Sequence, residues 1–154
     1  MRALRLDEGM PTKVDAIART VEKTHVWLNQ IGQKLGAADG RVPYHALRAV
    51  LHAIRDRMTV EQVAALGAQL PLLIRGMYYE GWHPHGKPLN VQDGEGFLRL
   101  VSIYLEQDAE VLMDERRVVA AVFQVMQAHL APGEIDTVLN AMPTPIQQVF
   151  FGMS

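Results

Sequence analysis

This chain of 154 residues contains no cysteine. Disulfide bonds, thiolate metal ligands and a cysteine nucleophile are therefore excluded. Aromatic residues are also scarce, at 6% of the sequence, while the hydrophobic fraction reaches 49%. Methionine and alanine fill the interior instead, and both residue types favour helices.

An excess of charge of one sign is absent as well. The formal net charge is −2 at pH 7, which argues against nucleic acid as a partner and against a polybasic membrane patch. The longest apolar runs are far shorter than the about 20 residues of a membrane-spanning helix. Acidic residues near the start of the chain do not fit a secretory signal. We therefore expect a cytoplasmic protein with no membrane segment.

Catalytic signatures are missing too. The chain has no GxSxG, no P-loop, no GxGxxG after a strand and no HExxH. The sequence accordingly nominates no catalytic residue, no metal site and no cofactor.

What the chain does contain is an internal repeat. When residues 46–79 are shifted forward by 72 positions, their apolar positions fall on apolar positions of residues 118–151 without a gap, and Pro71 falls on Pro143. One unit of about 65 residues has a broad apolar stripe that it cannot cover alone. We therefore expect two copies packed face to face.

The apolar spacing is helical throughout. Apolar residues recur at three and four positions, and no stretch alternates β-branched residues as a strand would. The predicted fold is all-α, a single domain of two pseudo-equivalent three-to-four-helix units packed together. Its expected divisions are an N-terminal arm at 1–12 and a helical domain at 13–152, which comprises copy one at 25–79, a linker at 80–92 and copy two at 93–152.

Local signals place several helix ends. Gly36 should end the first helix. Thr59 and Gln62 form a capping-box pattern for another helix, and Pro71 should interrupt that helix because proline lacks the N–H and clashes with the preceding turn.

Several phrases of the sequence resemble the bacterial family called domain of unknown function 2267. These phrases are Ala46–Met58, Gln69-Leu70-Pro71 followed by Ile74-Arg75, the Gly81-Trp82 pair and the helix with Phe97, Leu98 and Val101. The resemblance covers roughly residues 25–152. In the second copy Gln147 stands where the phrase has arginine. The family has no established activity, so the resemblance implies an all-helical bacterial protein and carries over no catalytic residue.

The linker contains the segment of the sequence that most suggests a binding site, His83-Pro84-His85, next to Trp82. Two imidazoles two residues apart could bind a metal if a nearby carboxylate joined them, or could line a small-ligand pocket at the seam between the copies. The alternative is a proline-stiffened linker whose histidines face water, with Trp82 closing the seam. The missing third ligand at a fixed spacing favours this alternative.

A polar stripe runs along the predicted helix at 46–58. His45, Arg48, His52 and Arg55 are spaced to share one helix face. We expect this stripe to lie opposite the apolar face, where it could meet phosphates or an acidic partner. The matching positions of the second copy carry a single charge, which favours an ordinary solvated face. Truncating His52 should then cost little stability.

The N-terminal helix is longer than its counterpart in the second copy. Val14, Ile17 and Val21 begin an apolar seam that continues with Thr24, Leu28, Ile31 and Leu35, the layout of a helix that pairs along its length. The half before residue 25 is extra. It either folds back on its own domain or packs on another chain, giving a protein partner or a homodimer through Val14, Ile17 and Val21.

These observations favour a non-enzymatic protein-interaction or self-association module. The alternative is a small-ligand- or metal-binding protein or an enzyme, with a pocket near Trp82, His83 and His85. A concave pocket with several buried titratable groups would favour the alternative. An exposed apolar surface would favour the interaction module.

Overall fold

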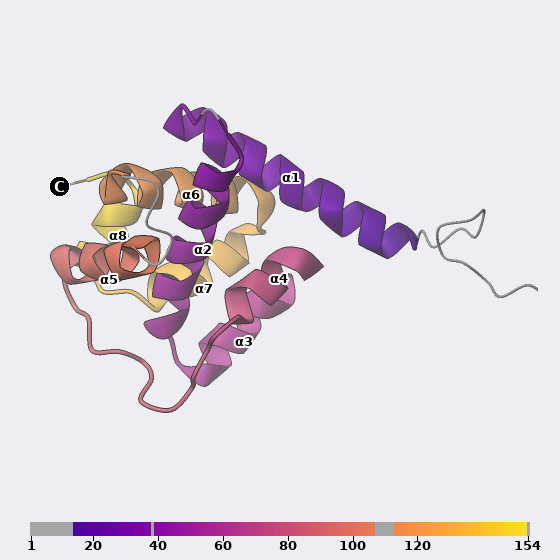
Figure 1. The fold of residues 1–154 in the computed structure, drawn as a ribbon. Helices are drawn as coiled ribbons and strands as arrows, with labels where there is room; N and C mark the ends of the chain where they lie inside the picture. Colours follow the sequence, from indigo (N-terminus) through magenta and orange to yellow (C-terminus); the bar gives the residue numbers. More distant parts are fainter. Residues whose placement is uncertain (1–13, 38, 107–112, 154) are drawn as a thin grey trace, which may run out of the picture.

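The computed structural model describes residues 14–37, 39–106 and 113–153. Within these ranges every regular element is an α-helix (Figure 1), so the all-α expectation is confirmed. The helices are α1 (Asp15–Leu35), α2 (Arg41–Asp56), α3 (Val60–Gln69), α4 (Leu72–Tyr79), α5 (Gly94–Glu106), α6 (Glu115–His129), α7 (Pro132–Asn140) and α8 (Thr144–Phe150). The expected arm at 1–12 lies outside the described residues.

The local sequence signals end the helices where expected. Gly36 adopts a left-handed conformation with φ 65° and closes α1, a conformation that glycine adopts at little cost. The Thr59–Gln62 capping box is formed at the start of α3. Pro71 lies between α3 and α4 and separates them.

Helix α2 is the centre of the core. It packs against α1, α4, α5 and α6, and it runs through the middle of the molecule in Figure 1. Eleven of its 16 residues are buried. Leu47, Val50, Leu51 and Ile54 are completely buried, and burying each such side chain contributes about 1.5–3 kcal/mol.

The helix order is compatible with the expected duplication. Helices α2–α3–α4 and α6–α7–α8 follow one another in the same order, and both α3 and α4 begin 72 positions before α7 and α8. The packing is reciprocal, because α1 contacts α2 and α6 while α5 contacts α6 and α2. Leu51 and its counterpart Phe123 are both completely buried.

Only the later part of the seam predicted along α1 faces the body of this chain. Thr24 and Ile31 are buried as expected, but Val14 and Ile17 are each 55% exposed. The side that faces the body is instead the one that carries Thr20 and Trp27. The Trp27 ring stacks on His129 of α6, with ring centroids 5.2 Å apart.

Two threonines, Thr20 and Thr24, are buried on the side of α1 that faces the body, and both of their hydroxyl groups are hydrogen-bonded. Thr24 Oγ1 donates to the carbonyl oxygen of Thr20 at 2.6 Å, and Thr20 Oγ1 accepts from the backbone N–H of Leu73 at 3.0 Å. Both hydroxyls are therefore satisfied, which removes most of the cost of burying them. The second bond also fixes α4 against α1.

The linker between α4 and α5 is non-helical, as its glycines and prolines predict. It is tied to the end of α2, since Leu89 N–H donates to the carbonyl oxygen of Asp56 at 2.8 Å and Arg57 donates to the carbonyl oxygen of Val91. In the described part of the chain, no helix has the length and apolar character that a membrane span requires.

Candidate functional site

The polar stripe on α2 is not the solvated face that its sequence predicts. His52 is 1% exposed and Arg55 is 2% exposed. The prediction is wrong because α5 and the ends of the linker also pack on this side of α2, and Leu89 and Glu80 are bonded there. The stripe is therefore largely an internal contact.

The Arg55 guanidinium is bound entirely by groups of this chain. It donates to the carbonyl oxygens of Tyr78 and Glu80 at 2.8 and 2.9 Å, and its Nε donates to Asp56 Oδ1 at 2.9 Å. Its remaining nitrogen lies 3.4 Å from the hydroxyl of Tyr104, which in turn donates to Asp56. A buried ion pair is tolerated when such hydrogen bonds complete it. The cluster joins α2 to the end of α4 and to α5.

His52 has a similar structural role. Its Nε2 donates to the carbonyl oxygen of Met77 at 2.7 Å, and its ring lies edge-on to Tyr104, with centroids 5.1 Å apart. Burial is the main cause that lowers the pKa of His52 to about 4; the hydrogen bond to Met77 raises this pKa and the neighbouring charge of Arg55 lowers it. Burial also raises the pKa of Tyr104 to about 12, with its hydrogen bond to Asp56 as the next cause. A neutral histidine in this position is not an anion site.

The outer part of the stripe also contacts the linker. Arg48 forms an ion pair with Glu80 at 3.0 Å, and His45 is half-buried. Asp56 and Tyr104 also belong to the cluster around Arg55, although no sequence pattern singled them out. A signal for Asp56 existed, because an acidic residue at the end of a helix opposes the helix dipole and so implies a specific partner.

Trp82, His83 and His85 do not form a pocket together. His83 and His85 are exposed, and Trp82 is half-buried beside the ring of Tyr79, with ring centroids 5.7 Å apart. Neither of the two cavities described below is lined by any of them. Among the described residues, no group of three or more histidine, aspartate or glutamate side chains is placed to hold a metal ion.

An apolar groove lies between the first half of α1 and α4. Its volume is about 560 Å³. Ile17, Thr20, Val21 and Thr24 form the α1 wall, and Leu72, Leu73, Gly76 and Met77 form the α4 wall. Tyr44 and Glu80 close the groove, and Glu80 is the one charged residue of its lining, paired with Arg48.

The walls of this groove expose large apolar side chains. Leu72 is 57% exposed, which matches the 55% of Ile17 on the opposite wall. Gly76 has no side chain to fill the groove from the α4 wall, and nothing lies within 4 Å of the position that a Cβ atom would take there. The bond between Thr20 and Leu73 holds the two walls at a fixed distance. The groove is therefore preformed, apolar and open.

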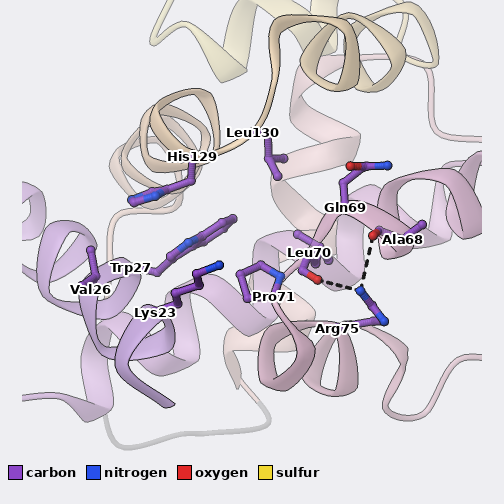
Figure 2. Close-up of a pocket in the computed structure, with 10 residues that line it drawn as sticks. All are labelled: Lys23, Val26, Trp27, Ala68, Gln69, Leu70, Pro71, Arg75, His129 and Leu130. Carbon is purple, nitrogen blue, oxygen red and sulfur yellow. Dashed lines mark hydrogen bonds between the residues drawn. The ribbon is translucent and has the colours of Figure 1, made fainter. Parts of the chain in front are cut away.

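A second cavity, of about 390 Å³, lies where α1, the α3–α4 junction and the end of α6 meet (Figure 2). The stacked rings of Trp27 and His129 line one side of it, while Arg75 points back to the carbonyl oxygens of Ala68 and Leu70. His129 Nε2 is bonded to Gln30 Oε1 at 2.7 Å, and burial lowers the pKa of this imidazole. Two of the polar side chains that line this cavity, Arg75 and His129, are thus already hydrogen-bonded within the fold.

Fold and groove together define a small all-α protein with an exposed apolar groove between two helices. A family described as "Uncharacterized conserved protein (DUF2267)" matches residues 24–149. The chain therefore belongs to this family, as the resemblance implied. No curated protein matches the chain. The match begins at Thr24, so the part of α1 that carries Val14, Ile17 and Val21 precedes it.

Proposed function

We propose that this chain is a non-enzymatic interaction module whose groove between α1 and α4 binds an apolar helix. The observation that carries the proposal is the pair of exposed apolar walls, with Ile17 and Val21 facing Leu72 and Leu73. Contiguous exposed apolar surface marks interaction sites. An amphipathic helix that lies in a groove is a common way for such a surface to be used.

The ionisable side chains support this function over the ligand-binding alternative. His52, Arg55 and Asp56 are buried, but each hydrogen-bonds within the chain. A ligand or reactive site would instead aim such groups into a cavity. Trp82, His83 and His85 line neither cavity, so the second reading of the sequence gains no support from them. We place the proposed function in the cytoplasm, in keeping with the balanced charge.

Thiol labelling tests the proposal, because the chain has no cysteine of its own. Leu73→Cys places one thiol in the groove, and Ile103→Cys places one on α5 as a matched control. The native side chains are 46% and 54% exposed. The rate of maleimide labelling is measured for dilute purified protein and in a soluble extract of the cells that naturally produce the chain.

We expect the extract to slow labelling of Leu73→Cys several-fold more than labelling of Ile103→Cys. The control corrects for small thiols of the extract that consume the reagent. Equal slowing of both variants would contradict the proposal, because a bound partner must cover the groove and leave α5 accessible.

A further inference from the structure

We infer that the groove is filled by a second copy of this chain, in an isologous contact in which the first half of each α1 lies against the groove of the other copy. The inference rests on the proposed function, because it takes the groove to be a docking surface. It adds the identity of the partner and the segment that the partner inserts.

The groove and the apolar ridge formed by Val14, Ile17 and Val21 share one surface of the molecule. The first turns of α1 extend beyond the body of the molecule (Figure 1) and carry Val14 and Ile17, each 55% exposed. Ile17 and Val21 also form one wall of the groove. A two-fold contact requires a self-complementary patch, and a projecting apolar helix beside its own groove is such a patch. In such a two-fold contact the ridge of each copy fills the groove of the other copy.

The charged residues of the first half of α1 lie away from its apolar ridge. At 100° per residue, Val14, Ile17 and Val21 share one side of the helix. Of the charged residues of the same half, Arg19 and Lys23 lie on the opposite side, while Asp15 and Glu22 lie on the flank, about 100° from Val14 and Val21. A copy of α1 therefore brings an uncharged apolar side, with Asp15 and Glu22 along one flank, to a groove whose single charged residue, Glu80, is paired with Arg48.

The spacing of the apolar residues along the ridge also suits a contact between two helices. Val14, Ile17 and Val21 follow the alternating three- and four-residue spacing of paired helices. In an antiparallel pair Ile17 of one copy meets Val21 of the other, and the two-fold axis makes this contact twice. The exposed apolar side chains of the surface are Val14, Ile17, Val21, Tyr44, Leu72 and Leu73. The two-fold axis doubles this set, so twelve exposed apolar side chains would meet in one contact.

The mass in solution tests the inference, measured by light scattering on the full chain over a wide range of concentration. Val21→Asp places a charge on the groove wall. Val26→Asp is the matched control, because both residues are valines of α1, they are 39% and 40% exposed, and they lie on different sides of the helix. Gly76→Phe is a second variant that fills the groove from the α4 wall without meeting a neighbour at its Cβ.

We expect the full chain and Val26→Asp to form dimers, and Val21→Asp and Gly76→Phe to associate at least tenfold more weakly. All four should keep the same circular dichroism and cooperative unfolding. A full chain that is monomeric at every concentration would overturn the inference. A dimer that neither Val21→Asp nor Gly76→Phe weakens would also overturn it, because the contact would lie elsewhere.

Labelling of Leu73→Cys in the purified protein separates this inference from the proposed function. Protection that rises with the concentration of the chain supports a second copy. Protection in the cell extract but at no concentration of the purified chain overturns the second copy and leaves the interaction module standing. Protection that is independent of concentration, and that is lost in a Leu4→Asp/Leu6→Asp variant, assigns the groove to residues 1–13 of the same chain and overturns the inference. Absence of protection in both samples overturns inference and proposed function together.

Discussion

Gln147 does in the second half of the chain what Arg75 does in the first half. Arg75 Nε donates to the carbonyl oxygen of Gly67 at 2.7 Å, and its Nη2 donates to that of Leu70 at 3.1 Å. Gln147 Nε2 donates to the carbonyl oxygens of Leu139 and Met142 at 2.8 and 2.9 Å. Each acceptor of Gln147 lies 72 positions after an acceptor of Arg75. The second copy departs from the family phrase, yet the C-terminal end of the preceding helix is capped in both halves.

Removing the Arg75 cap should destabilise the fold. Arg75→Ala leaves carbonyl oxygens at the end of α3 without their donor, and hydrogen bonds from a charged group contribute about 1.5–3 kcal/mol. Because Arg75 is half-exposed, we expect a loss of about 1–2 kcal/mol in the free energy of unfolding, measured in urea. Arg75→Gln should lose less than half as much, since an amide does the same work at Gln147. Equal losses in the two variants would contradict this account.

Leu51 and Phe123 should be among the costliest positions to truncate. Both are completely buried and occupy matching positions of α2 and α6. Leu51→Ala and Phe123→Ala should each lower the free energy of unfolding by about 2–5 kcal/mol, because the removed side chain leaves a cavity that the surroundings only partly close. Urea or thermal unfolding measures both. A loss below about 1 kcal/mol at either position would mean that the side chain does not face the core.

His52→Ala should also be costly, contrary to the expectation for a solvated stripe. The variant opens a cavity beside Tyr104 and removes the donor to the carbonyl oxygen of Met77. We expect a loss of about 2–4 kcal/mol in the free energy of unfolding. The exposed His85 provides the control, with a change below about 0.5 kcal/mol for His85→Ala. If the two variants unfold at the same urea concentration, the burial of His52 is refuted.

The stability should fall on mild acidification because of His52. Its pKa is about 4 in the folded chain against an ordinary value of 6.5. Between these values the unfolded chain binds a proton that the folded chain does not, so the free energy of unfolding decreases as the pH falls from 6.5 toward 4. At about 1.4 kcal/mol for each pKa unit, the contribution of this group is on the order of 3 kcal/mol.

A comparison with His52→Gln isolates this contribution from that of the carboxylates. Glutamine keeps an N–H donor for the Met77 carbonyl oxygen but has no proton to gain. The difference in the free energy of unfolding between the native chain and the variant should therefore shrink as the pH falls through this window. A difference that stays constant from pH 6.5 to 4 would show that His52 titrates normally.

We predict that His83 and His85 bind no zinc tightly. Both side chains are exposed, and no third ligand is fixed beside them among the described residues. Calorimetric titration of the full chain with zinc measures this directly. Micromolar or tighter binding that disappears in the His83→Ala/His85→Ala variant would overturn the prediction and restore the metal-binding alternative.

The sequence by itself determined the helices, their ends and most of the core. Gly36, the Thr59–Gln62 capping box and Pro71 act on their immediate neighbours, so their effect does not depend on the rest of the fold. Most matched apolar positions of the repeat, such as Leu51 and Phe123, are also buried as predicted, whereas Phe151 is 50% exposed. Their spacing fixes one face of each helix, and the hydrophobic effect turns that face inward.

Only the tertiary structure decided which elements cover the polar faces of the helices. Helix α5 and the ends of the linker bury His52 and Arg55, and their partners come from residues 20 or more positions away. Trp27 stacks on His129 of α6, while Val14, Ile17 and Val21 at the other end of α1 stay exposed. A periodic pattern shows which side of a helix is apolar, but it does not show how many neighbours the helix has. The groove between α1 and α4 exists because two helices distant in sequence stop short of covering each other.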